Sequence, residues 1–226
     1  MKILAVEFSS PQRSVAVVQA TDGGPRVLGS RQSAFGPADH RSADALGLVA
    51  GALRGAQVEG EQIECVAVGI GPGSYTGIRA AIALAQGWQL GRGVKLLAIS
   101  SVECLAAQAQ AEGLSGRVEV VIDAQRHEFY LAGYDLSAAG WRQAEPLRLA
   151  ALAEVQARQR AGGAIIGPEA TRWFPGSRLL FPHAATLGRL ALGRSDFMAG
   201  EDMAPLYLRE TRFVKAPPPR RLPRSA

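Results

Sequence analysis

The chain has 226 residues, and its 25 Lys and Arg residues outnumber its 20 Asp and Glu residues by five. Hydrophobic residues make up 47% and charged residues 20%, an ordinary globular composition that excludes a disordered chain, a collagen and a disulfide-rich scaffold. The longest stretch without a charge, residues 65–78, is shorter than the roughly 18 apolar residues of a membrane-spanning helix, and no secretory signal follows Lys2. We therefore expect a cytoplasmic protein without a membrane partner.

All of the excess positive charge lies at the C-terminal end. Residues 209–226 contain six basic residues against Glu210, so residues 1–208 sum to zero. Four of the 13 prolines also lie there, and such a composition does not support a packed core. We expect a basic, Pro-rich, disordered tail over 209–226. Two interpretations stay open for it: a solvated segment, or one that makes weak, salt-sensitive contacts with phosphates.

The first half of the chain predicts three strands followed by alternating helices and strands. Apolar runs between turn residues indicate strands, and apolar residues at helical spacing indicate helices. A capping box of Ser100 and Glu103 is expected to open the last of these helices. In chain order we expect strands at 2–10, 14–19 and 26–33, a helix over 39–55, a strand at 63–70, a helix from 78 to Gly91 or Gly93, a strand at 94–99 and a helix over 100–112.

The second half begins like the first. An apolar strand again ends on a carboxylate, Asp123 in place of Glu7, and a short polar turn leads to a returning strand. The expected elements are strands at 118–123, 127–134 and 164–167 and helices at 149–159 and 184–192. We infer a duplicated α/β fold of the actin, Hsp70 and sugar-kinase (ASKHA) class with a truncated second copy, divided into lobes at 1–112 and 113–208. In that class a nucleotide lies between the halves, against two acidic hairpin turns.

The most informative loop runs from Gly69 to Arg79. Backbone N–H groups at the start of a helix suit an anion, yet no Lys-Ser/Thr follows as in a Walker loop, and the third glycine comes one position too late for a dinucleotide fingerprint. The pattern leaves open a tight strand-to-helix turn capped by Ser74 or Thr76, and a phosphate or partner contact. The candidate site residues are Gly71, Gly73, Ser74, Thr76, Gly77 and Arg79.

Residues suited to metal binding or covalent catalysis are scattered. The three histidines form no His-x-x-x-His pair, and Cys65 and Cys104 form no Cys-x-x-Cys pair. Ser74 has no histidine and carboxylate that the sequence assigns to it. Glu7 and Asp123 are candidates to flank a cleft between the halves, in a structural or a catalytic role. We therefore predict no catalytic residue and no metal site.

Several motifs, taken together, resemble the TsaB (YeaZ) family, the partner subunits of bacterial threonylcarbamoyladenosine synthesis on tRNA. The resemblance runs from residue 1 to about 209, and the Gly-Pro-Gly-Ser-aromatic-Thr-Gly block is its most specific part, with Tyr75 where Phe is usual. The motifs are Ile3-Leu-Ala-Val-Glu7 with Ser9-Ser10, Gly71-Pro-Gly-Ser-Tyr-Thr-Gly-Ile-Arg79, Ala85-Gln-Gly87, Ile99-Ser-Ser-Val-Glu103, Ile122-Asp-Ala-Gln-Arg-His-Glu-Phe-Tyr130 and Pro205-Leu-Tyr-Leu-Arg209.

The resemblance implies an actin-like fold and a non-catalytic scaffold or activator. In that family the paralogue TsaD is the enzyme: it holds a metal through a His-x-x-x-His pair and transfers the threonylcarbamoyl group to the adenosine next to the anticodon of ANN-decoding tRNAs. The resemblance also implies docking of TsaD on helices near 40–55 and 75–90, with TsaE joining the pair. A homodimer without TsaD, contact with tRNA only through the complex, and no cofactor beyond a weakly bound nucleotide at the cleft or subunit interface are further implications.

Two other functions stay open. One is an independent ATP-dependent phosphotransferase of the actin-like class, which needs a catalytic carboxylate with Mg-ATP; Asp123 is the residue to test. The other is a free-standing RNA-binding protein that uses the basic tail. For the loop at 71–77 we expect that it positions the helix that follows, with anion binding secondary.

Overall fold

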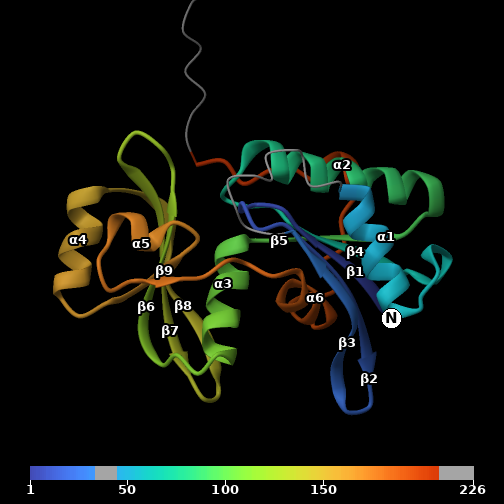
Figure 1. Cartoon of the computed structure of the whole chain (residues 1–226), viewed down its shortest axis with the longest axis horizontal. Helices are drawn as coiled ribbons and strands as arrows, with labels where there is room; N and C mark the ends of the chain where they lie inside the picture. The colour runs from blue at the N-terminus through green and yellow to red at the C-terminus, as the bar shows by residue number, and fades with distance from the viewer. Residues whose placement is uncertain (34–44, 209–226) are drawn as a thin grey trace, which may run out of the picture.

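The computed structural model describes residues 1–33 and 45–208. His40, the start of the first expected helix and the basic tail over 209–226 lie outside these residues. Two five-stranded sheets stand side by side, each with helices on both faces (Figure 1). Within the described ranges, no helix is long and apolar enough to cross a membrane.

The first sheet has the strand order β3-β2-β1-β4-β5. Strand β1 pairs antiparallel with β2 and parallel with β4, so three hairpin-type strands lead into a parallel half. Its elements are β1 (Lys2–Glu7), β2 (Ser14–Thr21), β3 (Gly24–Gln32), α1 (Ala45–Ala56), a 3₁₀ turn (Gly60–Gln62), β4 (Cys65–Gly69), α2 (Tyr75–Arg92), β5 (Lys95–Ile99) and α3 (Ser101–Ala111).

The second sheet repeats the same order of elements, as β10-β9-β6-β7-β8. It comprises β6 (Gly116–Asp123), β7 (Glu128–Ser137), β8 (Gly140–Ala151), α4 (Leu152–Arg160), β9 (Ala164–Gly167), α5 (Ala170–Trp173), β10 (Arg178–Leu179) and α6 (Ala184–Leu192), followed by a 3₁₀ turn (Gly200–Asp202). The predicted duplication is confirmed. The second copy is shortened within its elements: α5 has four residues where α2 has 18, and β10 has two where β5 has five.

The last helix of each half packs on the sheet of the other half. On β1, Leu4 and Val6 face the core under α1 and α2, whereas Ile3 and Ala5 face the core under α6. On the second sheet α3 covers one face, and α4 and α5 cover the other. Helices α3 and α6 therefore lie between the two sheets, where they contact each other (Figure 1). The predicted boundary at residues 112 and 113 falls between α3 and β6, and the two lobes remain a prediction.

Strand β8 corrects one prediction. A helix was expected over 149–159, but residues 149–151 complete β8, and α4 begins at Leu152. The 12-residue strand β8 was not expected because Pro146 and alternating charged residues weaken its pattern. Both are typical of a sheet edge, which is where β8 lies.

The expected capping box at the start of α3 is also wrong. Ser100 occupies the N-cap position without a side-chain cap bond. Glu103 instead forms an ion pair with Arg194 at 3.4 Å, so its carboxylate points toward the returning C-terminal segment. Helix α2 runs through Gly91 and ends at Gly93, whose left-handed backbone (φ 66°) closes the last turn.

Candidate functional site

The glycine loop between β4 and α2 is tied to two neighbouring segments by its own backbone. The N–H of Gly71 donates to Ser101 Oγ at 3.2 Å, and its carbonyl accepts from the N–H of Ser101 at 2.8 Å. The N–H of Ser74 donates to the carbonyl of Ser9 at 2.7 Å. The Gly71–Pro72 peptide bond is cis. The loop therefore joins the start of α3 to the turn after β1.

Two glycines let the start of α2 lie directly against the backbone of residues 8 and 9. A Cβ atom on Gly73 would lie 2.1 Å from the carbonyl oxygen of Ser9, and one on Gly77 would lie 2.0 Å from that of Phe8. Gly73 also has a φ of +149°, which side chains rarely adopt. Glycine is required at both positions by close approach, and this explains why the motif is rich in glycine.

Ser74 is the N-cap of α2. Its Oγ accepts a hydrogen bond from the N–H of Gly77 at 3.3 Å, and the helix begins at Tyr75. Of the two residues proposed as the cap, the structure selects Ser74. Thr76 lies in the first turn with an exposed side chain. Several polar groups that suited an anion thus bond within the chain: the N–H groups of Gly71, Ser74 and Gly77.

We predict that Ser74→Ala costs about 1 kcal/mol of unfolding free energy, because it leaves one N–H at the helix start without its acceptor. Urea unfolding followed by circular dichroism measures this cost. Thr76→Ala is the control. Thr76 lies two residues further along and is exposed, so this substitution should change stability by less than about 0.5 kcal/mol. Equal losses in both variants would contradict the assignment of the cap.

Glu7 lies in the interior beneath this loop, with no solvent exposure. Its carboxylate accepts from the N–H of Ser9 at 2.7 Å and from the O–H of Ser101 at 2.9 Å. Burial raises the pKa of Glu7, while the bonds from Ser9 and Ser101 act in the opposite direction. A Cβ on Gly69 would lie 1.9 Å from this carboxylate. Glu7 therefore joins the end of β1 to the start of α3, packs against Gly69 of β4, and is closed to solvent.

Asp123 occupies the equivalent position in the other half. Its Oδ1 accepts from the N–H of Gln125 at 2.7 Å, which repeats the Glu7–Ser9 bond two residues along. Gln125 and the two residues after it all have positive φ, between 59° and 65°. Glu169 was missed by the sequence analysis. Burial raises the pKa of Glu169. A hydrogen bond with the backbone of Asp123 lowers this pKa, and the negative charge of Asp123 raises it.

The remaining titratable candidates are structural within the described residues. His127 packs edge-on against Trp173, and His183 Nε2 lies 3.2 Å from Gln12 Oε1. Burial raises the pKa of Cys65 to about 12 and that of Cys104 well above its ordinary value, so both thiols stay protonated. In the ranges 1–33 and 45–208, no three His, Cys, Asp or Glu side chains group as metal ligands.

The outer face of α2 begins with polar residues and continues with small and apolar ones. Its exposed side chains follow helical spacing: Thr76, Arg79, Ala83, Gly87 and Leu90. Leu90 is 89% exposed, and no atom lies within 4 Å of the position of a Cβ on Gly87. On the neighbouring helix α1, Leu46 is 70% exposed. Within residues 1–33 and 45–208, nothing covers this face at Gly87.

The N-terminal end of α2 contacts the segment around Tyr207. The N–H of Leu206 donates to the carbonyl of Ile70 at 2.9 Å, and this places Tyr207 on Tyr75, with ring centroids 5.7 Å apart. Arg79 donates to the hydroxyl of Tyr75 at 3.0 Å. Tyr207 was not among the predicted site residues, although it lies in the Pro205–Arg209 motif.

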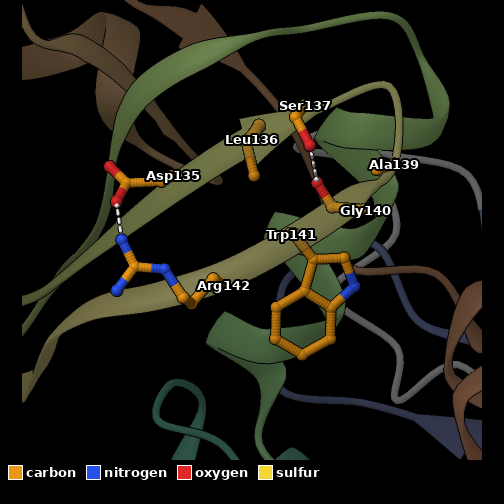
Figure 2. Close-up of a pocket in the computed structure, with 7 residues that line it drawn as sticks. All are labelled: Asp135, Leu136, Ser137, Ala139, Gly140, Trp141 and Arg142. Atoms are coloured by element: carbon orange, nitrogen blue, oxygen red, sulfur yellow. Dashed lines mark hydrogen bonds and ion pairs between the residues drawn. The ribbon is translucent and has the colours of Figure 1, made fainter.

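A shallow hollow lies elsewhere, on the hairpin that joins β7 and β8 (Figure 2). Asp135 and Arg142 form an ion pair at 2.7 Å across the two strands, and the ring of Trp141 forms one side. The hollow is at the opposite end of β7 from the turn that follows Asp123. None of the predicted site residues lines it.

The duplicated arrangement, with a helix from each half between two sheets, defines an actin-like α/β protein. A family model described as tRNA N6-adenosine threonylcarbamoyltransferase (TsaD) matches residues 37–190. YeaZ from Pseudomonas aeruginosa has a TM-score of 0.72 and 26% identity, over 92% of this chain and 99% of that chain.

Two curated relatives match over part of their length. The tRNA threonylcarbamoyladenosine biosynthesis protein TsaB of Escherichia coli K12 is 39% identical over 72 residues, which cover 32% of this chain and 31% of that protein. An uncharacterized protein of Mycobacterium tuberculosis H37Rv is 30% identical over 134 residues, 58% of each chain. The matches thus span about a third to three fifths of these relatives. This chain belongs to the TsaD-related family, in its TsaB/YeaZ branch.

Proposed function

We propose that this chain is a non-catalytic subunit for the synthesis of threonylcarbamoyladenosine on tRNA, and that it docks and activates the catalytic paralogue TsaD. Two relatives named as threonylcarbamoyladenosine biosynthesis proteins support the pathway. The proposal places the protein in the cytoplasm, with TsaE as a further partner and a homodimer in the absence of TsaD. The main structural support for this proposal is the exposed outer face of α2.

A glycine inside a helix lowers stability by roughly 0.5–1 kcal/mol relative to alanine, so its presence there needs a structural or functional reason. Gly77, in the first turn of α2, has one in the close contact with the carbonyl oxygen of Phe8 already described. Gly87 has none among the described residues, where no atom lies within 4 Å of its Cβ position. A partner helix packed on Ala83 and Gly87 supplies the reason, because small side chains let two helix axes approach closely.

The use of the polar groups supports a scaffold in preference to an enzyme. The carboxylate of Glu7 accepts hydrogen bonds from Ser9 and Ser101 in the interior of the first half. The N–H groups of Ser74 and Gly77 form hydrogen bonds that fix the start of α2. The motif therefore serves the placement of α2, and α2 presents the docking face.

Gly87→Trp tests this proposal. The indole has room in the free chain but would fill the space that a partner helix occupies, so we expect TsaD from the same organism to bind at least tenfold more weakly. Size-exclusion chromatography with light scattering, followed by titration calorimetry, measures the complex. The matched control is Ala157→Trp, on the exposed side of α4 in the other half, which should bind TsaD normally.

Each of three results would contradict a part of the proposal. A Gly87→Trp variant that binds TsaD like the unmodified chain would contradict docking on this face. Two separate peaks for the unmodified chain and TsaD, both folded, would contradict the scaffold itself. Nucleotide hydrolysis by the chain alone, abolished by Asp123→Asn, would favour the phosphotransferase instead.

A further inference from the structure

Residues 194–208 return across the first half after α6 and pass beside α2 (Figure 1). We call this segment the strap. Among its residues, all of which the structure describes, the 3₁₀ turn Gly200–Asp202 is the only helical element, and Met198 forms a single β-bridge with Leu96 of β5. Met203 is buried in the same core cluster as the inner face of α2. The strap therefore packs on the side of α2 that faces its own sheet.

Both ends of the strap are fixed to neighbouring elements. At its start, Arg194 forms the ion pair with Glu103 of α3 at 3.4 Å. Near its end, the N–H of Leu206 donates to the carbonyl of Ile70 at 2.9 Å, just before the glycine loop. The strap thus connects a helix that lies between the two sheets with the segment that leads into α2.

In the middle of the strap, two glutamines of α2 bind a single residue. Gln86 Nε2 donates to the carbonyl oxygen of Gly200 at 2.7 Å, and Gln89 Oε1 accepts from the N–H of Gly200 at 2.7 Å. The two glutamines are three positions apart and therefore lie next to each other on one side of the helix. Because a carbonyl only accepts and an N–H only donates, Gln86 must present its nitrogen and Gln89 its oxygen. Gly200 is buried, so these bonds supply partners for its backbone in place of water.

Glycine at position 200 permits this close contact. A Cβ there would lie 2.8 Å from Gln89 Oε1 and 3.2 Å from Gln86 Cγ. Two consecutive residues of the Ala85-Gln-Gly87 motif thus face different surroundings: Gln86 contacts the strap, and Gly87 lies on the outer face of α2. The contact with the strap and the proposed docking face therefore belong to the same turn of α2.

We propose that Gln86 and Gln89 are positioning residues, whose two hydrogen bonds keep the strap closed on α2, and that the closed strap holds the C-terminal half of α2 in the position that partner docking requires. Release of the strap breaks a few hydrogen bonds and exposes Met203, and leaves the strands of the sheet paired, so it needs far less than global unfolding. A partner that prefers the held position of α2 also favours the closed strap. The inference deepens the proposed function and rests on it only for TsaD as the partner.

Two glutamate variants test the proposal, because the same substitution has opposite effects at the two positions. Gln86→Glu replaces a donor with a carboxylate that faces the carbonyl oxygen of Gly200, and should release the strap. Gln89→Glu keeps an acceptor for the N–H of Gly200 and should leave the strap closed. Each variant adds one negative charge to the same side of α2, so a general effect of charge would change both alike.

Hydrogen exchange of the free full chain, followed by mass spectrometry at pH 7.5, measures the release. We expect Gln86→Glu to speed exchange about tenfold in residues 196–206 and also in residues 83–92 of α2, and Gln89→Glu to stay within about twofold of the unmodified chain. Strands β1 and β4 should exchange alike in all three chains. Unchanged exchange in Gln86→Glu would overturn the proposal, as would equal release in Gln89→Glu. Faster exchange in the strap without α2, or throughout β1 and β4, would overturn the selective hold on α2.

Titration calorimetry with TsaD measures the consequence for docking. Gln86→Glu should bind at least about threefold more weakly, and Gln89→Glu should bind like the unmodified chain. Conversely, bound TsaD should slow exchange in residues 198–203 of the unmodified chain, because coupling between two sites is reciprocal. A Gln86→Glu variant that releases α2 and binds TsaD with unchanged affinity would contradict the positioning role. If the unmodified chain binds no TsaD, the proposed function is wrong, whereas exchange in the free chain still shows whether the glutamines hold α2 through the strap.

Discussion

Gly73→Val is expected to destabilise the chain by at least about 3 kcal/mol. The new Cβ would lie 2.1 Å from the carbonyl oxygen of Ser9, so the backbone must move. The φ of +149° adds strain of roughly 1–3 kcal/mol, because a β-branched side chain rarely adopts it. The movement also separates Ser74 from Ser9 and displaces the start of α2. Partner docking should therefore be lost together with stability.

The control for Gly73→Val is Gly87→Ala on the same helix. With open space at that position, this substitution should stabilise the free chain by roughly 0.5–1 kcal/mol. Urea unfolding measures both changes, and light scattering with TsaD measures docking. A Gly73→Val variant with unchanged stability and intact docking would show that the loop does not position α2.

Much of the fold follows from local pattern. The strands at the centre of each sheet are apolar runs bounded by turns, since both of their faces are buried, and they lie where the sequence predicts them. Strand β8 departs from this rule because an edge strand faces water on one side and tolerates Pro146. The exchange of α3 and α6 between the sheets leaves no local signal, because an apolar helix face does not specify which sheet it covers.

The glycine loop shows where sequence information ends at the site. Its position between a strand and a helix was predictable, and so was a cap at Ser74 or Thr76. The need for Gly73 was not, because the contact with Ser9 joins segments 64 residues apart in the chain. The burial of Glu7 was hidden in the same way: a carboxylate at a strand end looks available until Ser101 of α3 lies against it. Tyr207 reaches Tyr75 across an even longer separation.

The two halves use one local motif for different purposes. Glu7 and Asp123 each accept the N–H two residues ahead, so the duplicated turn has kept its backbone geometry. In the first half the carboxylate is enclosed and supports α2. In the second half Asp123 is half-buried beside Glu169, and the helix at the place of α2 has only four residues. The long helix α2 and the buried carboxylate beneath its preceding loop are thus features of one half alone.

Glu7 provides the second large effect. Glu7→Ala should cost roughly 3 kcal/mol, because it leaves the N–H of Ser9 and the O–H of Ser101 without an acceptor and opens a cavity. Ser101 also accepts from the N–H of Gly71, so the loss should extend to the glycine loop. Glu7→Gln keeps the volume and an acceptor, and should remain within about 1 kcal/mol of the unmodified chain at pH 4.5.

The pH dependence of stability tests whether burial raises the pKa of Glu7. Burial raises the pKa of Glu7 in the folded chain above its ordinary value of 4.5. Below that value both states carry the proton; as the pH rises above it, the unfolded chain ionises first, and stability falls until the pH passes the folded pKa. Glutamine does not titrate, so the stability of Glu7→Gln relative to the unmodified chain should increase with pH above 4.5.

Urea unfolding of both chains at several pH values from 4.5 to 7.5 gives this difference directly. Burial also raises the pKa of Glu103 and Glu169, but these groups are present in both chains and cancel in the comparison. A difference that stays constant over the range would mean that Glu7 ionises equally in the folded and unfolded states. The bonds from Ser9 and Ser101 would then fully offset the effect of burial on the pKa of Glu7.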